Sequence, residues 1–303
     1  MIKYGSDKFW ELNKYCLSQI NIPIQNKFQR QTFMSKQSEL IGEHPKLGLF
    51  ADWCKCEDIT SIPTKKYRKL SDKGINRDSL IEQLADYIII HHISPNKIEQ
   101  FEKKKSILKK HEFEQYVIER MPFPIKNDKT IKGNFGEIIL AEYLKASSSL
   151  ELLIYKLRFN PNIEQSMKGD DILLFNKLDI NTKIIMGEAK FRATKSKQAL
   201  DDIINSLSKN NLPISLTFVS NRLSELGEHD LSNDVDDLIS KVHSKKLPVI
   251  YVGFYHSELE VSTTIETHLN TDNENLVLIS YGEQNPEKLI KESFDKAIEK
   301  IMS

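Results

Sequence analysis

The spacing of apolar residues in the first 125 positions predicts helices joined by long irregular segments. A helix over residues 79–91 is indicated by apolar side chains at helical intervals, namely Leu80, Ile81, Leu84, Ala85 and Ile88. Ser94-Pro95-Asn96 ends this helix, and Asn96 can cap a second, highly charged helix that runs to about Met121. Pro122 and Pro124 then break the pattern. Residues 1–125 are therefore predicted to form a mainly helical N-terminal region.

From residue 126 onward the pattern changes to short apolar strands between helices. Strands are predicted over residues 150–159, 171–175, 184–191, 214–219, 249–254 and 276–281. Helices are predicted over residues 135–145, 195–209, 231–243 and 286–302. The segment 176–182 is rich in Asn and Asp and joins two strands as a hairpin loop. This order predicts an α/β domain over residues 126–303, with a mixed sheet flanked by helices.

The composition is that of a folded globular protein. The chain has 303 residues, of which 39% are hydrophobic and 28% are charged, and this length favours two domains. The net charge is zero, but residues 1–125 hold 21 Lys and Arg against 16 Asp and Glu, whereas residues 126–303 hold 22 against 27. A basic front half and an acidic back half fit a binding region joined to a metal-binding one. Chance and ordinary solvated helix faces explain the same split, so charge alone decides nothing.

Nothing in the sequence predicts attachment to a membrane. The most apolar stretch, residues 84–93, has about half the length needed to span a bilayer. The first residues lead into no long apolar run of the kind found in secretory signals. Cys16, Cys54 and Cys56 are an odd number and make no disulfide framework, which suits a reducing compartment. We therefore expect a cytoplasmic protein.

The strongest chemical signal joins an aspartate at the start of one predicted strand to an acid and a lysine on the next. Asp171 precedes the apolar run 172–175, and Glu188 and Lys190 lie two positions apart on the strand that the hairpin pairs with it. Alternation along a strand places Glu188 and Lys190 on the same face. Charged side chains on an inner face are costly unless they bind something. Two carboxylates and a backbone carbonyl are the oxygen ligands that Mg²⁺ prefers, so this face is predicted to bind a divalent cation.

The choice between the adjacent Asp170 and Asp171 follows from the same alternation. Neighbouring residues on a strand point in opposite directions, so only one of the two easily meets Glu188. Asp171 directly precedes the apolar strand and is assigned to the metal, with Asp170 as the alternative. Glu137, on the predicted helix before the strands, can reach the same metal. The metal would polarise a phosphate and generate hydroxide from bound water, and Lys190 would hold that water or the scissile phosphate.

These residues resemble the signature of the PD-(D/E)xK nucleases. Glu137, Asp171 and Glu188-Ala189-Lys190 follow in that order on helix, strand and strand, and the likeness covers roughly residues 130–255. Two adjacent aspartates stand where the general signature needs one. More narrowly, three motifs resemble the HamA nuclease family of the Hachiman anti-phage defence system, namely Gly136-Glu137, Lys168-Gly169-Asp170-Asp171 and Gly187-Glu188-Ala189-Lys190-Phe191.

The resemblance implies a restriction-endonuclease-like fold, a Mg²⁺-dependent deoxyribonuclease in which Mn²⁺ can replace Mg²⁺, and a HamB-type helicase as partner. The sequence contains no Gly-x-x-x-x-Gly-Lys-Ser/Thr loop, so movement along DNA would have to come from that partner. Residues 1–125 are then expected to dock the partner or to regulate the nuclease. Two alternatives stay open. One is another PD-(D/E)xK enzyme, such as a restriction or repair endonuclease; the other is a catalytically inactive nucleic-acid-binding or scaffold protein.

Two further sets of residues are candidates for contact with DNA. Lys195, Lys197 and Gln198 begin the helix that follows the Glu188 strand, although an exposed helix position explains Gln198 equally well. Residues 65–69 are a basic stretch, interpreted as a phosphate-contacting loop, a solvated loop or a surface for a partner protein. Its candidate contacts are Lys65, Lys66, Arg68 and Lys69.

Overall fold

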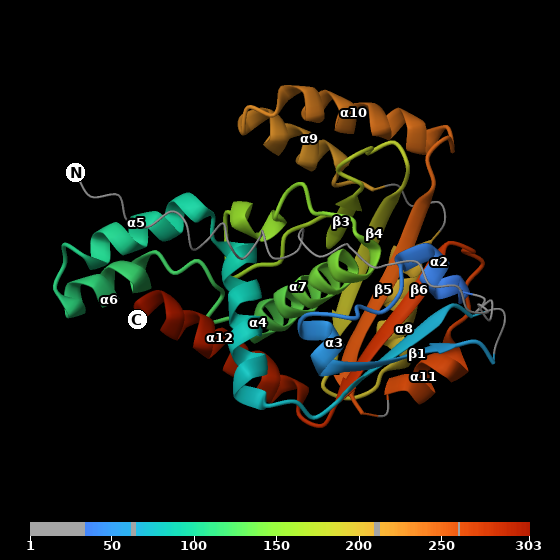
Figure 1. Cartoon of the computed structure of the whole chain (residues 1–303), viewed down its shortest axis with the longest axis horizontal. Coiled ribbons are helices and arrows are strands. Elements are labelled where there is room, and N and C mark those ends of the chain that lie inside the picture. Colours follow the sequence, from blue (N-terminus) through green and yellow to red (C-terminus); the bar gives the residue numbers. More distant parts are fainter. Residues whose placement is uncertain (1–33, 62–64, 209–212, 260) are drawn as a thin grey trace, which may run out of the picture. The chain divides into compact units, whose positions relative to one another are not determined.

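One mixed sheet organises the computed structural model, which describes residues 34–61, 65–208, 213–259 and 261–303. Within these residues six strands follow the order β1-β2-β6-β5-β4-β3 (Figure 1). The four inner strands run parallel, and the outer β1 and β3 run antiparallel to their neighbours. The strands are β1 Cys54–Ile59, β2 Tyr67–Asp72, β3 Ile172–Phe175, β4 Ile184–Phe191, β5 Val249–Glu258 and β6 Leu276–Glu283. The predicted mixed sheet flanked by helices is confirmed.

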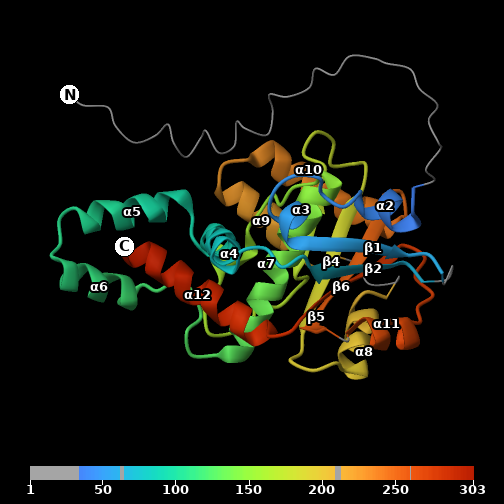
Figure 2. The same ribbon diagram turned by 60° about the horizontal axis from the view of Figure 1, so that its bottom comes forward.

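Helices cover both faces of the sheet and divide the apolar side chains into two clusters (Figure 2). On β4, Ile185 points into the first cluster and Met186 into the second, as alternation along a strand requires. The first cluster is covered by α4 Arg77–His92, α7 Asp128–Ser148 and α12 Pro286–Met302. The second is covered by α8 Lys197–Ser206, α9 Leu216–Glu225, α10 His229–His243 and α11 Val261–His268.

The predicted hairpin of β3 and β4 is confirmed, and it packs closely on α7. Ile172 lies opposite Gly187 in the register of the two strands. A Cβ on Gly187 would lie 2.4 Å from Cγ1 of Ile172 and 3.0 Å from Leu140 of α7, so the approach requires a glycine. One turn earlier on α7, a Cβ on Gly136 would lie 3.3 Å from the Cβ of Ala189. This packing places Glu137, the residue after Gly136, beside β4.

The first part of the chain supplies strands as well as helices. From residue 34 to residue 125, its described helices are α2 Lys36–Ile41, α3 Leu49–Trp53, α4, α5 Pro95–Lys105 and α6 Lys110–Glu119. The prediction of a mainly helical region missed β1 and β2, which continue the sheet because β2 pairs in parallel with β6. The boundary expected near residue 125 does not separate two compact units, since residues 35–303 form one.

A predicted helix and a predicted strand take a different form. The charged helix expected to reach Met121 is two helices, α5 and α6, with a break between Lys105 and Lys110. The strand expected over 150–159 is reduced to one bridge, Glu151 to Phe175, and then a short 3-10 helix, η1 Lys156–Phe159.

The strand prediction over 214–219 was wrong, because this segment leads into α9. Four buried residues of α9 follow the spacing of a helix face, namely Leu216, Val219, Ser220 and Leu223. The short apolar run at its start imitates a buried strand, and only the residues beyond 219 reveal the helical period.

No described helix is long and apolar enough to cross a membrane. Cys54 and Cys56 are free thiols on β1. Cys16 lies outside the described residues.

Candidate active site

Three separate elements bring the predicted acids Glu137, Asp171 and Glu188 to one place. Glu137 lies on α7 and is only 8% exposed. Asp171 stands one residue before β3, and its carboxylate accepts a hydrogen bond of 2.8 Å from the backbone N–H of Ala189 on β4. In the antiparallel register Ile172 faces Gly187, so Asp171 comes opposite Glu188. The hairpin and α7 therefore join these acids as the sequence predicted.

Lys190 is the nearest cation to Glu188. Both side chains lie on the same face of β4, and the ammonium of Lys190 donates to the Glu188 carboxylate. Lys190 is the more exposed of the two, with 28% of its side chain accessible against 12% for Glu188. The ammonium of Lys190 is thus the more accessible end of this ion pair.

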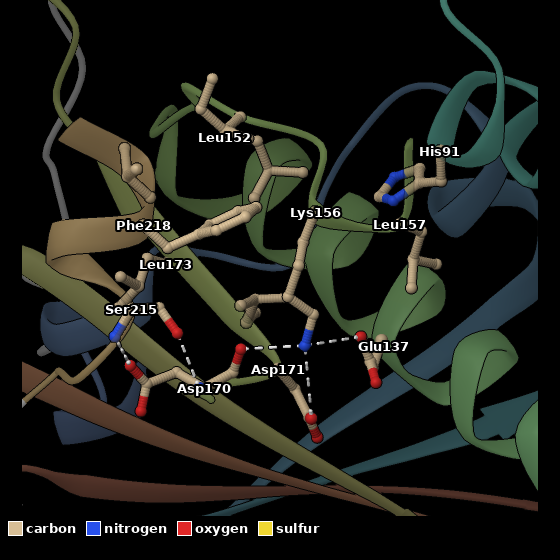
Figure 3. A pocket seen from close by; sticks show the side chains of 13 residues that line it. His91, Glu137, Leu152, Lys156, Leu157, Asp170, Asp171, Leu173, Ser215 and Phe218 are labelled. Carbon is tan, nitrogen blue, oxygen red and sulfur yellow. Dashed lines mark hydrogen bonds and ion pairs between the residues drawn. The ribbon is translucent and has the colours of Figure 1, made fainter. Parts of the chain in front are cut away.

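A second lysine, Lys156, was not among the predicted site residues. Its ammonium lies 3.2 Å from Glu137 Oε2 and 3.9 Å from Asp171 Oδ1, and it donates to the backbone carbonyl of Asp170 at 3.0 Å (Figure 3). Because residues 150–159 were assigned to a strand, nothing marked this lysine for the site. The available signal was one cation inside the apolar run from Leu150 to Leu157.

Burial and mutual repulsion raise the pKa of each acid. Burial raises the pKa of Asp171 to about 7, and the charge of Glu137 adds to the rise. Burial is also the main reason why the pKa values of Glu137 and Glu188 are raised. Burial alone would lower the pKa of Lys156, but the carboxylates of Glu137 and Asp171 outweigh it and raise that pKa. The site therefore keeps Lys156 charged, and ionising its buried acids costs free energy.

The charges in the site do not balance. Glu137, Asp171 and Glu188 carry three carboxylates when ionised, against the ammonium groups of Lys156 and Lys190. Such an excess of buried negative charge attracts a cation. Among the described residues, however, no group of three or more His, Cys, Asp or Glu side chains is gathered so that it could hold a metal ion. Here the Lys156 ammonium lies between Glu137 and Asp171, and the Lys190 ammonium pairs with Glu188.

Asp170 is turned away from this cluster. Its carboxylate accepts from the backbone N–H of Ser215 at 2.9 Å, and its own N–H donates to Ser215 Oγ at 2.9 Å. Gly169, with φ of +108°, leaves no room for a Cβ, which would lie 2.6 Å from Ser215 Oγ. Asp170 therefore fastens the segment before β3 to the start of α9, and the geometry favours Asp171 as the residue that works with Glu188.

This geometry predicts different outcomes for the two aspartates. Asp171→Asn should lower any metal-dependent cleavage activity by at least about 100-fold, because it removes a charge from the centre of the site. Asp170→Asn should leave a measurable part of that activity, since the amide oxygen of Asn can still accept from Ser215 N–H. Cleavage assays on both variants, with circular dichroism to confirm folding, decide between them. The reverse ranking would overturn the assignment of Asp171.

The candidate DNA contacts after β4 lie on the surface. Lys195, Lys197 and Gln198 are all exposed. Lys197 pairs with Asp201 at 2.5 Å and Gln198 donates to Asp202 at 2.8 Å, both one turn along α8. The structure brings none of the three side chains into the contacts of the acid cluster described above.

The basic stretch 65–69 runs into strand β2, which begins at Tyr67, and one of its candidate contacts is inaccessible. Arg68 is 0% exposed, and its guanidinium pairs with Asp58 of β1 at 2.6 Å. It also donates to the hydroxyl of Ser38 and to the carbonyl of Gly42, each at 2.9 Å. Arg68 therefore cannot contact DNA in this fold, and the prediction that it does was wrong. Lys65, Lys66 and Lys69 are partly exposed and stay candidates.

The fold and the site together define an α/β protein with a buried cluster of acids and lysines where α7 meets the β3–β4 hairpin. The model of the HamA family matches residues 48–298. The chain is also 39% identical over 265 residues to a Bacillus cereus protein named Hachiman protein HamA, which covers 87% of this chain and 96% of that protein. The chain belongs to the HamA family. The match includes β1 and β2 together with the acid cluster, in keeping with the single compact unit of residues 35–303.

Proposed function

We propose that this chain is a metal-dependent DNA nuclease of an anti-phage defence system. The observation that carries the proposal is the convergence of Glu137, Asp171, Glu188 and Lys190 from a helix and two paired strands. Membership of the HamA family supports it, because the resemblance on these same motifs implies a nuclease. The chain would then be a phosphodiester hydrolase.

The side chains suit Mg²⁺ or Mn²⁺ by their chemistry. Carboxylate oxygens are the donors that hard divalent cations prefer, and three acids face two lysines in the site. Asp171 and Glu188 would hold the ion, with Glu137 as a third ligand. When bound, the ion would polarise the phosphate and lower the pKa of a water molecule.

Lys190 would act on the phosphate or on the attacking water. Its ammonium is fixed by Glu188 and lies at the more exposed end of the pair. Burial works against its charge, but Glu188 and Asp171 together raise the pKa of Lys190, so the cation persists at neutral pH. A fixed positive charge beside the scissile phosphate stabilises the negative charge that develops during hydrolysis.

The surrounding surface and a partner would supply the remaining functions. The proposed contacts to the DNA backbone are Lys195, Lys197 and Gln198 together with Lys65, Lys66 and Lys69. The sequence has no ATP-binding loop of the Gly-x-x-x-x-Gly-Lys-Ser/Thr type, so a HamB-type helicase is proposed to move along DNA and to hold the nuclease in check.

The direct test is a cleavage assay on plasmid and linear DNA, with the purified chain alone and with the helicase. The chain should degrade DNA with Mg²⁺ or Mn²⁺ and stop when EDTA is added, and the helicase should lower this basal rate. Discrete bands at fixed positions would favour a restriction enzyme instead. Binding of DNA with no metal-dependent cleavage under any condition, with or without the helicase, would leave a nucleic-acid-binding scaffold.

A further inference from the structure

We propose that Lys156 is the internal counter-ion of Glu137 and Asp171, and that a divalent cation must displace its ammonium in order to bind. The counter-ion role stands on the geometry of these residues alone. The displacement rests on the function proposed above, because it requires the acids to bind a metal.

The contacts of the Lys156 ammonium lie inside the site. A lysine has three N–H donors. The ammonium of Lys156 faces Glu137 Oε2 at 3.2 Å, Asp171 Oδ1 at 3.9 Å and the carbonyl of Asp170 at 3.0 Å (Figure 3). Only 11% of the Lys156 side chain is exposed. The cation is thus held between Glu137 and Asp171, two of the three carboxylates proposed to bind the metal.

The backbone that carries Lys156 is anchored, so this position is set by the fold. Lys156 begins η1, and two residues later Arg158 donates twice to the carbonyl of Ile90 on α4, at 2.9 and 2.7 Å. Leu157 is buried in the first apolar cluster. Because Leu157 and Arg158 hold this turn in place, the side chain of Lys156 is the part that can move.

A metal ion and the ammonium cannot occupy the same place. Two cations between one pair of carboxylates repel each other, and the two acids that pair with Lys156 are both proposed ligands of the metal. Lys156 lines a small pocket together with Leu152, Ile154 and Phe218, whose apolar side chains can pack on the methylene stem of a lysine that has turned away from the acids (Figure 3). Metal binding therefore has to break the contacts of Lys156 first, which weakens the apparent affinity.

The test compares Lys156→Met with Lys183→Met in the full-length chain. Lys183 is a matched control, because it is also partly buried and its ammonium donates to the carbonyl of Leu40. In EDTA at pH 8, Lys156→Met should unfold at least about 5 °C below wild type, because it leaves two buried carboxylates without their cation. Lys183→Met should unfold close to wild type. The double variant Glu137→Gln with Lys156→Met should recover most of the lost unfolding temperature. This double variant also provides a folded protein for the test if Lys156→Met folds poorly.

Titration with MnCl₂ in a calorimeter tests the displacement. Lys156→Met should bind Mn²⁺ at least about tenfold more tightly than wild type. If Lys156→Met does not fold, the double variant should bind Mn²⁺ at least about tenfold more tightly than the single variant Glu137→Gln, which keeps Lys156. Equal or weaker binding would refute displacement while leaving the proposed metal site intact. If no form binds Mn²⁺, the metal site and the displacement both fail, and the unfolding temperatures alone decide the counter-ion role. An unfolding temperature of Lys156→Met equal to that of Lys183→Met would refute that role.

Discussion

Replacing Glu188 by Ala should lower the rate of metal-dependent DNA cleavage by at least about 100-fold. Glu188 is mostly buried beside Asp171, and it fixes the ammonium of Lys190. Its loss would remove a proposed metal ligand and release the lysine at the same time. Lys190→Met should cause a comparable loss for a different reason, because the site would keep its acids but lack the cation beside Glu188. Nicking of supercoiled plasmid with Mg²⁺, under single-turnover conditions, measures both effects.

Stability measurements separate this loss from unfolding. Removing one carboxylate from a like-charged group relieves repulsion, so Glu188→Ala without metal should unfold at the wild-type temperature or above it. The matched control is Glu151→Ala, because Glu151 is an exposed acid at the β3 edge whose contact is Lys177. This control should cleave DNA like wild type. Undiminished cleavage by Glu188→Ala would refute the assignment of Glu188 to the active site.

The part of the site that the sequence predicts correctly depends on local geometry. Glu188 and Lys190 are two positions apart on a strand, and such residues share a face whatever surrounds the strand. The strand is paired through a short polar loop, so Asp171 is brought opposite Glu188 by neighbouring residues alone. The position of Glu137 needed only that the preceding helix pack on the hairpin, which the small residues Gly136 and Gly187 allow.

The part that the sequence does not reveal depends on contacts between distant segments. Lys156 enters the site because the segment from Glu151 onward pairs with β3 through a single bridge and then turns into η1, which is anchored to α4. β2 joins the sheet by parallel pairing with β6, near the other end of the chain. Non-local parallel pairing leaves no short-range mark in the sequence, and a polar strand such as β2 resembles a loop.

The pairing of β2 with β6 also changes how the front of the chain can be studied. Residues 1–125 include β1, β2 and α4, and α4 packs on α12. Deleting them would strip two strands from the sheet and expose the edge of β6. The expectation that this region docks a partner stays a prediction, and single surface substitutions are the suitable way to test it.

Arg68 shows that a basic residue in a basic run can be buried and have a structural role in place of DNA contact. In sequence it belongs to a basic run, and in the structure its guanidinium is enclosed by β1, α2 and α7. It pairs with Asp58 at 2.6 Å and donates to the hydroxyl of Tyr143 at 3.3 Å. Removing one partner of a buried ion pair leaves the other as an uncompensated charge, which is far more costly than losing a surface pair.

Arg68→Met should therefore destabilise the chain by about 3–5 kcal/mol, because Asp58 loses its cation and the carbonyl of Gly42 loses its donor. Lys69→Met is the matched control, since Lys69 is the next residue on β2 and is partly exposed. It should change stability by less than about 0.5 kcal/mol. Urea unfolding followed by circular dichroism gives both values, provided that the dependence on urea concentration is the same for the variants. DNA affinity, measured where both variants are fully folded, should not differ between Arg68→Met and wild type. A loss of DNA affinity with unchanged stability would return Arg68 to the set of phosphate contacts.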